Sequence, residues 1–434
     1  MPSSIDRPFQ KIAVIGQGYV GLPLALLFVN KGHTVYGVDV DPKKIEGLRQ
    51  GVSYLPDVQD EELRWSLATE RYHPTDRYEK VAEADAIIIC VPTPLNASHS
   101  PDLTILEKAV VEIGKFLQKG QMVILESSTY PGTTREVLQP LLEKESGLTA
   151  GIDFHIGYSP ERIDPGNKDY KVEQIPKIVS GLTATCVESA QALYSSVFDK
   201  VVRVSSPDVA ELTKLLENSH RLINISFMNE IAAICDKMNI DVWEVIEAAQ
   251  TKPFGFTAYY PGPGIGGHCI PVDPLYLQWK AQKFGTESKF IQLSDEINRS
   301  IPSYIMNRVK AILAKQSAPE HASILLYGVA YKKDINDVRE SPALDLIHLL
   351  AEAEFSVSYH DPFIPEIQVN GQRYTSVEID EDTLRSADCV IIFTDHSVIP
   401  LDQIIEHAPL VFDTRNATAG VQDKHHVYRM GAGK

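Results

Sequence analysis

Hydrophobic and polar positions along the first 205 residues follow two alternating periods. Short apolar runs rich in β-branched residues, KIAVIG and TVYGVDVD, predict strands, and QGYVGLPLALLFVNKG between them has the helical period. Further strand-like runs follow, separated mostly by helical stretches: ADAIIICVPTP, QMVILESST, DFHIGYSP, KIVSGL and KVVRVSS. Strand, helix and strand within about 30 residues form the parallel βαβ unit. The pattern therefore predicts a doubly wound α/β domain over residues 1–205.

The pattern changes at Pro207, where a long helical stretch, SPDVAELTKLLENSHRLINISFMNEIAAICDKMN, begins. Ser206 and Pro207 suit its N-cap and first turn, and its length suits a spine between domains. A second helical stretch, TESKFIQLSDEINRSIPSYIMNRVKAILAK, follows, so residues 206–315 form a central helical region.

The strand and helix alternation restarts after this region. SILLYGVAY, a helix around SPALDLIHLLAEA, then FSVSYHDP, ADCVIIFTDH and PLVFDT predict a smaller parallel sheet over residues 316–434. Its first strand leads into YGVAYKKD without a G-x-G-x-x-G, so we expect this domain to hold something other than a dinucleotide. The fold class expected is thus α/β, with two Rossmann-like doubly wound parallel-sheet domains joined by a long central helix.

Composition narrows the class of protein. The 434 residues are 44% hydrophobic and 23% charged, which is usual for a globular protein of two or three domains. No run of about 18 apolar residues occurs and MPSSIDRPFQ lacks a signal-peptide core, so we expect a cytoplasmic protein without a membrane partner. A net charge of −17 makes a nucleic-acid partner unfavourable, because the long-range field repels phosphate polymers.

The five cysteines are far apart and include no C-x-x-C pair, which argues against a disulfide framework and a structural zinc site. We expect no metal. Four of them lie in apolar or helical surroundings typical of buried small hydrophobes: Cys90, Cys186, Cys235 and Cys389. Cys269 differs, because it lies within PGPGIGGHCIPVDP, which is too rich in glycine and proline for a helix or strand.

The first strand is followed by a dinucleotide-binding motif. Gly16, Gly18 and Gly21 form a G-x-G-x-x-G that opens a helix, where glycine allows a tight turn and close approach of backbone N–H groups to a pyrophosphate. Asp39 ends the second strand, where a carboxylate accepts both ribose hydroxyls. A 2′-phosphate would be repelled there, so the motif favours NAD over NADP.

Two turns, VPTP and SSTYPG, end later strands at the edge where open α/β sheets bind ligands. Thr93 and Thr129 in these turns are candidate cofactor contacts, and simple turn chemistry explains them equally well. On the central helix, Lys214, Asn218 and Arg221 share one face, which is either a ligand face or a solvated one.

The cysteine loop has the composition of a site closely approached by a ligand. Its glycines leave backbone unshielded and its prolines hold its shape. A nucleophilic Cys269 needs thiolate character, which Lys214 could supply, and Asp273 could orient water or move protons. The alternative is a buried, inert cysteine.

With the glycine motif, SSTYPG, SPER, the Lys214 helix and the cysteine loop in this order, the chain resembles the UDP-glucose/GDP-mannose dehydrogenase family from KIAVIGQGYVGLPLA to KKDINDVRESPALDL. The resemblance implies an NAD-binding domain, a central helical dimerisation region, a C-terminal domain that binds the UDP-sugar, and a homodimer. It also implies oxidation of C6 of a nucleotide sugar to a carboxylate with two NAD molecules, through a thiohemiacetal and a thioester on Cys269.

The resemblance assigns roles to particular residues. The catalytic set is Cys269, Lys214 and Asn218 at the oxyanion, Asp273 and Glu161 for water and protons, and Thr129 beside the reacting carbon. The cofactor set is Gly16, Gly18, Tyr19, Val20, Gly21, Asp39, Lys44, Pro92, Thr93, Thr129 and Arg339. The substrate set is Arg162, Lys214, Asn218, Arg221, Gly266, Tyr331, Lys332 and Arg415.

Departures from the UDP-glucose enzymes indicate the substrate. GGHCIPVDP replaces their GGSCFPKD, and this form is similar to the branch acting on UDP-N-acetylhexosamines. SPERIDPGN places Pro165 at a second acidic position, and only Lys252 lies near the place of a cross-subunit arginine. UDP-N-acetylglucosamine is the substrate we expect, with the galacto and manno epimers and UDP-glucose as alternatives. A two-electron 3-hydroxyacid dehydrogenase and a non-enzymatic NAD-binding scaffold are the rival functions, and neither explains Cys269.

Overall fold

The structure is a computed structural model that describes residues 9–55, 58–96, 98, 100–162, 170–267, 269–316, 321–421 and 425–433. The chain forms two compact units. The first contains residues 1–217 and 272–286, and the second contains residues 218–271 and 287–434. Among the described residues, no helix has both the length and the apolar character needed to cross a bilayer.

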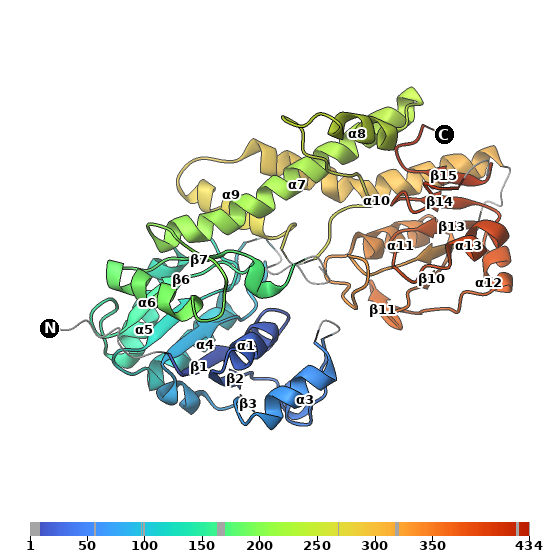
Figure 1. The fold of residues 1–434 in the computed structure, drawn as a ribbon. Helices are drawn as coiled ribbons and strands as arrows, with labels where there is room; N and C mark the ends of the chain where they lie inside the picture. Colours follow the sequence, from blue (N-terminus) through green and yellow to red (C-terminus); the bar gives the residue numbers. More distant parts are fainter. Residues whose placement is uncertain are drawn as a thin grey trace. The chain divides into compact units, whose positions relative to one another are not determined.

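The first unit is built on a six-stranded parallel sheet in the order β3-β2-β1-β4-β5-β6 (Figure 1). Its strands are β1 (Lys11–Ile15), β2 (Thr34–Val38), β3 (Tyr72–Thr75), β4 (Ala86–Ile89), β5 (Met122–Leu125) and β6 (His155–Tyr158). This is the strand order of dinucleotide-binding folds, in which the chain reverses direction across the sheet between β1 and β4.

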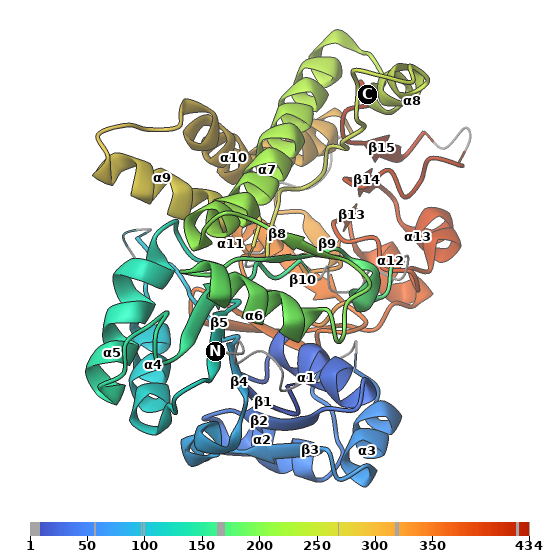
Figure 2. The same ribbon diagram turned by 60° about the vertical axis from the view of Figure 1, so that its left-hand side comes forward.

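Helices cover both faces of this sheet. They are α1 (Gly21–Asn30), α2 (Pro42–Arg49), α3 (Asp60–Ala68), α4 (Thr104–Phe116), α5 (Gln139–Ser146), α6 (Ala184–Tyr194) and α9 (Asp273–Lys283), with the shorter turns η1 (Tyr78–Glu83), η2 (Thr134–Leu138) and η3 (Val172–Gln174). Ile12 and Val14 of β1 pack in the core with α1 and α6, whereas Ala13 and Ile15 pack in the core with α4 and α5 (Figure 2). Because parallel strands are buried on both faces, they read as continuous apolar runs in the sequence.

Two predicted strands lie outside the main sheet. KIVSGL and KVVRVSS form β7 (Lys177–Val179) and β8 (Val201–Arg203), which pair with each other in a separate two-stranded parallel sheet. The long helix α7 (Pro207–Met238) follows, and the Ser206 hydroxyl accepts a hydrogen bond from the Val209 amide at 3.3 Å, as its predicted capping role requires.

The second unit has a five-stranded parallel sheet in the order β10-β9-β13-β14-β15. Its strands are β9 (Ser323–Tyr327), β10 (Ser356–His360), β13 (Cys389–Ile392), β14 (Val411–Asp413) and β15 (Val427–Arg429), and β11 (Glu366–Val369) pairs with β12 (Gln372–Thr375) in a hairpin. Its helices are α8 (Val242–Gln250), α10 (Lys289–Lys315), α11 (Pro342–Glu352), α12 (Glu381–Ser386) and α13 (Leu401–His407). Ile324 and Leu326 face a core formed with α8, α10 and α11, and Leu325 and Tyr327 face α12 and α13. The two doubly wound α/β sheets expected from the sequence are therefore confirmed.

Candidate active site

The glycine motif after β1 has the geometry that a pyrophosphate site needs. Gly16 has a φ of +91°, and a Cβ there would lie 2.6 Å from the Cys90 carbonyl oxygen. A Cβ at Gly21 would lie 1.8 Å from the Gly16 carbonyl oxygen, so these two glycines close the turn and pack it on β4. A Cβ at Gly18 would meet nothing within 4 Å. Gly18 therefore borders open space at the first turn of α1, which fits a phosphate approached by backbone.

The residues between these glycines are placed at the start of α1. Val20 is the N-cap residue of α1 and makes no side-chain capping bond. The first backbone N–H groups of the helix therefore have no side-chain cap and suit a bound phosphate. Tyr19 and Val20 are half-buried against the core that contains α1.

Asp39 directly follows β2 and is 8% exposed. Its Oδ2 accepts a hydrogen bond from the Gln17 amide at 2.9 Å, and its Oδ1 accepts one from the Asp41 amide at 3.0 Å. Lys44 Nζ lies 3.6 Å from Oδ2. The two amides fix the carboxylate beside the glycine turn and leave acceptor capacity on each oxygen, which fits two ribose hydroxyls.

The turns after β4 and β5 lie at the same carboxyl edge of the sheet. Thr93 is buried and its hydroxyl donates to the Ser128 carbonyl oxygen at 2.6 Å, which joins the two turns. Thr129 is fully buried and its hydroxyl donates to the Tyr130 carbonyl oxygen at 3.2 Å, while Pro92 is exposed. These bonds account for the threonines as turn residues, and their contact with a cofactor remains a prediction.

Lys214 and Glu161 are in direct contact. Lys214 is 7% exposed, and its Nζ donates to the Glu161 carbonyl oxygen at 2.6 Å. A second buried lysine, Lys177, lies 2.8 Å from Glu126 Oε2 and 3.7 Å from Glu161 Oε2. The Tyr194 hydroxyl donates to the other oxygen of Glu126. Burial raises the pKa of Glu126 to about 7, although the neighbouring Lys177 opposes this shift.

The sequence analysis missed Lys177 and Glu126. Glu126 directly follows the apolar run of β5, and a carboxylate at the carboxyl end of a buried parallel strand is a signal that the sequence contains. Lys177 begins the short strand β7, where nothing in its surroundings predicts burial. Together they place one cation between the carboxylates of Glu126 and Glu161, while Lys214 contacts the backbone of Glu161.

Glu211, one turn before Lys214 on α7, was also missed. It is fully buried and its carboxylate accepts from the Gly132 amide at 2.6 Å, the Thr134 amide at 2.9 Å and the Thr134 hydroxyl at 2.7 Å. Burial raises its pKa to about 7 against the opposing effect of these bonds. Glu211 thereby joins the SSTYPG turn to the first turns of α7, which carry Lys214.

Arg162 has a structural partner in the first unit. Its guanidinium forms a two-point contact with Glu217, at 2.8 and 3.3 Å, and donates to the Pro176 carbonyl oxygen at 2.8 Å. Its predicted contact with substrate would therefore compete with an ion pair. Pro165 lies outside the described residues.

In the second unit, side-chain amides hold the cysteine loop. Asn229 Oδ1 accepts from the Gly262 amide at 2.8 Å, and Asn298 exchanges two hydrogen bonds with the backbone of Ile265, at 2.7 and 3.1 Å. Cys269 is exposed, whereas the other four cysteines are buried as predicted. His268 lies outside the described residues. The loop thus carries an exposed thiol four residues after its anchored Ile265.

Three predicted substrate residues meet at this loop. A Cβ at Gly266 would lie 2.5 Å from the Glu340 carbonyl oxygen and 2.7 Å from Tyr331 Cβ, so only glycine fits there. A Cβ at Gly262 would lie 3.0 Å from Arg415 Nη1, the tip of that side chain. Arg415 Nε donates to the Phe393 carbonyl oxygen at 3.0 Å, and burial lowers the pKa of its guanidinium. Lys332 follows Tyr331 and is half-buried.

The remaining predicted residues are placed as follows. Asn218 is buried one helical turn after Lys214 on α7, and Arg221 is exposed three residues later. Asp273, in the first unit, is fully buried at the start of α9. Arg339 pairs with Asp337 at 2.7 Å, with its side chain half exposed.

Comparison with known proteins identifies the three parts of the chain. Residues 10–198, 208–300 and 325–420 match the NAD binding, central and UDP binding domains of the UDP-glucose/GDP-mannose dehydrogenase family. The UDP-N-acetyl-D-glucosamine 6-dehydrogenase of Pseudomonas aeruginosa is 40% identical over 82% of this chain and 83% of its own length. The enzyme of that name from Salmonella typhi is 38% identical over 89% and 90% of the two chains.

A solved structure extends the likeness to the whole fold. The UDP-D-ManNAc dehydrogenase of Pyrococcus horikoshii superposes with a TM-score of 0.89 at 30% identity, over 98% of this chain and all of that one. The chain therefore belongs to the UDP-glucose/GDP-mannose dehydrogenase family and is an NAD-dependent UDP-sugar dehydrogenase.

Proposed function

We propose that the enzyme oxidises C6 of a UDP-N-acetylhexosamine, with UDP-N-acetylglucosamine as the preferred substrate, to the corresponding uronic acid. The names of the relatives from P. aeruginosa and S. typhi support the gluco epimer. The structure of the P. horikoshii enzyme keeps the manno epimer as the alternative. The observation that carries the chemistry is the exposed thiol of Cys269 on a loop fixed by two asparagines.

The reaction is a four-electron oxidation with Cys269 as the nucleophile. NAD, when bound, supplies the hydride acceptor in each of two successive steps. The C6 alcohol loses a hydride and a proton to give the aldehyde, and the Cys269 thiolate adds to its carbon while the oxygen takes up a proton, which gives a thiohemiacetal. Loss of a second hydride and proton gives a thioester. Water then breaks the C–S bond, which releases the carboxylate and returns the thiol.

Residues of the first unit and of α7 would stabilise the negative charge that develops on oxygen and would transfer protons. A lysine ammonium such as that of Lys214 stabilises an alkoxide as it forms, and the Asn218 amide donates a hydrogen bond beside it. Glu161 would accept and return protons, because Lys177 holds its carboxylate in place at 3.7 Å and Lys214 donates to its backbone carbonyl oxygen. Asp273 would orient the water that hydrolyses the thioester.

The test compares wild type with Cys269→Ala on UDP-N-acetylglucosamine and its galacto and manno epimers, with UDP-glucose as control. We expect wild type to form the uronic acid fastest from UDP-N-acetylglucosamine, and Cys269→Ala to form none at a steady rate. Uronic acid at the wild-type rate from Cys269→Ala would refute the thioester route. A higher kcat/KM for another sugar would refute the substrate assignment alone.

We propose a homodimer that forms through the central region, residues 206–315. Phe227, Ile234 and Met238 lie along one face of α7 and are 53%, 47% and 61% exposed, which is unusual for large apolar side chains of an isolated chain. Light scattering tests this, and a monomer at micromolar concentration would refute it. The same proposal divides the chain into segments 1–205, 206–315 and 316–434. It also places the enzyme in the cytoplasm, where a cysteine thiol stays reduced.

A further inference from the structure

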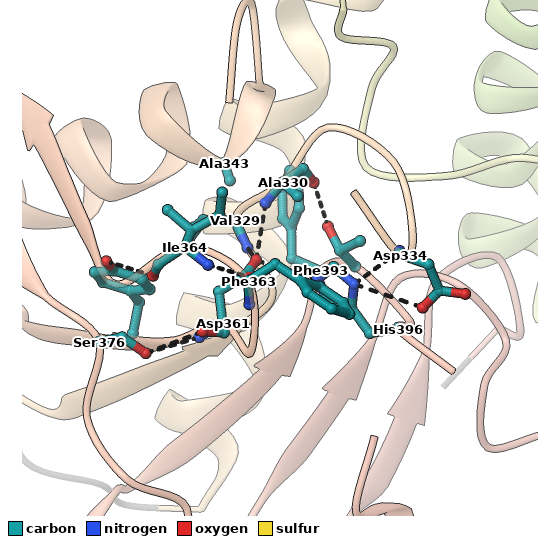
Figure 3. A network of polar contacts seen from close by, with 12 residues as sticks. Val329, Ala330, Asp334, Ala343, Asp361, Phe363, Ile364, Ser376, Phe393 and His396 are labelled. Atoms are coloured by element: carbon teal, nitrogen blue, oxygen red, sulfur yellow. Dashed lines mark hydrogen bonds and ion pairs between the residues drawn. The ribbon is translucent and has the colours of Figure 1, made fainter. Parts of the chain in front are cut away.

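A buried polar network joins three loops at the carboxyl edge of the second sheet (Figure 3). Asp361, directly after β10, accepts hydrogen bonds from the Val329 and Ala330 amides on Oδ2, at 2.7 and 3.0 Å. Its Oδ1 accepts from the Phe363 and Ile364 amides at 2.9 and 3.2 Å. Burial alone would raise the pKa of Asp361, but hydrogen bonds from His396 and from these amides hold it below the usual range. Asp361 is thus an ionised anchor for the loop after β9.

His396 connects this anchor to a second point on the same loop. Its side chain is fully buried, with Nε2 3.1 Å from Asp361 Oδ2 and Nδ1 2.9 Å from the Asp334 amide nitrogen (Figure 3). A backbone amide only donates, so Nδ1 must accept, and the proton of the neutral ring is on Nε2, which donates to Asp361. The surroundings therefore select one tautomer of His396.

Asp334 is held on both sides in an unfavourable backbone conformation. Its φ is +61°, a region that non-glycine residues rarely occupy. Its carboxylate accepts from the Ser397 amide at 2.7 Å and the Ser397 hydroxyl at 2.5 Å, while its own amide donates to His396. Such conformations persist only where several contacts enforce them, and they cluster at ligand sites.

The loop held in this way lies where this sheet would bind a ligand. From β9 the chain crosses through α11 to β10 on one side, and β13 pairs with β9 on the other side, so the direction of winding changes between β9 and β13. Ligands of open α/β sheets bind outside the carboxyl ends of the strands at this point. Lys332 and Lys333 lie there, two residues and one residue before Asp334.

We propose that His396 is a positioning residue for the UDP-sugar: by accepting the Asp334 amide bond, it fixes segment 331–334 so that Lys332 meets the diphosphate. The inference rests on the proposed function only in taking a UDP-sugar as the ligand. His396 itself touches neither the substrate nor the reacting atoms. Its effect is therefore on affinity for the nucleotide and not on hydride transfer.

Two substitutions of His396 separate the effects of its two hydrogen bonds, because each keeps one bond and removes the other. Asparagine places Oδ1 at the position of Nδ1 and keeps the bond from the Asp334 amide, whereas glutamine extends toward the position of Nε2 and keeps the bond to Asp361. We expect His396→Gln to raise KM for the UDP-sugar about tenfold or more, and His396→Asn to raise it less than about threefold. In both variants kcat and KM for NAD stay within about twofold of wild type.

Titration calorimetry with UDP alone separates this inference from the proposed function. A wild-type enzyme that does not bind UDP refutes the proposed function. If wild type binds UDP and His396→Gln and His396→Asn bind it equally well, or lose it equally, the positioning role is refuted. Asp334→Gly tests the same loop without threatening the fold, because glycine accepts a φ of +61°. We expect it to weaken UDP binding through loss of the Ser397 contacts, and unchanged affinity would also contradict the proposal.

Discussion

Replacing Gly18 or Gly21 by alanine separates two roles of the glycine motif. A methyl group at residue 21 would lie 1.8 Å from the Gly16 carbonyl oxygen, whereas ordinary contact begins at 3.4 Å. Backbone would have to move by about 1.6 Å to make room. A methyl group at residue 18 meets no atom within 4 Å, but it occupies the space in which a pyrophosphate would contact the backbone.

The two contacts set the expected magnitudes. Overpacking against backbone costs about 1–3 kcal/mol, so Gly21→Ala should lower the unfolding midpoint of the first unit by about 2–12 °C. Gly18→Ala should leave the free energy of unfolding within about 0.5 kcal/mol of wild type. The same steric cost, applied to the cofactor, raises the Kd of Gly18→Ala for NAD by about 5- to 150-fold.

Calorimetric unfolding without ligand and titration with NAD measure both quantities on the same samples. The reasoning is refuted if Gly18→Ala binds NAD as tightly as wild type, or if it loses as much stability as Gly21→Ala. The affinity for UDP serves as a control, because residues 18 and 21 lie outside residues 325–420, which match the UDP binding domain of the family.

Substitutions of three further residues, and one compensating substitution, test the electrostatics of the first unit. Asp39→Ala should weaken NAD binding about tenfold or more while UDP affinity stays within about twofold, and equal loss of both in calorimetry would contradict the division between cofactor and nucleotide domains. Lys177→Met should lower the free energy of unfolding by about 3–5 kcal/mol at neutral pH, because Glu126 and Glu161 then lose their shared cation. Adding Glu126→Gln should restore part of it in urea unfolding, and no recovery would count against the pair. For Glu211 the folded pKa is about 7 and the reference value is 4.5, so its contribution to stability is full below pH 4.5 and declines by about 3 kcal/mol as pH rises through 7. Glu211→Gln should remove that slope, and an unchanged pH dependence of unfolding would refute the assignment.

The sequence predicts the two main sheets well because their strands are buried on both faces. Each central strand is an uninterrupted apolar run, such as IAVI in β1 or MVIL in β5. The helices between the strands keep the helical period. The edge strand β3, Tyr72–Thr75, was missed because YHPT is polar and contains a proline, which an edge tolerates. The hairpin of β11 and β12 was missed although Asn370 and Gly371 between its strands, both with positive φ, are its usual turn signal.

The candidate site was predicted unevenly for a physical reason. The sequence singles out the glycines and Asp39 because they follow strands at fixed spacing, and Cys269 because its loop excludes regular structure, and their roles stay predictions. Lys177, Glu211 and His396 were missed because burial of a polar side chain depends on partners that are distant in sequence, 51 residues away for Lys177 and Glu126. Such pairs have no local period or motif.

The most direct test of the central claim is the amount of NADH formed per UDP-sugar consumed, measured with UDP-N-acetylglucosamine as substrate. The account predicts two NADH for each sugar, with the uronic acid as product, because Cys269 retains the aldehyde for a second oxidation. One NADH per sugar, with free aldehyde accumulating, would contradict the role of Cys269 as the covalent nucleophile.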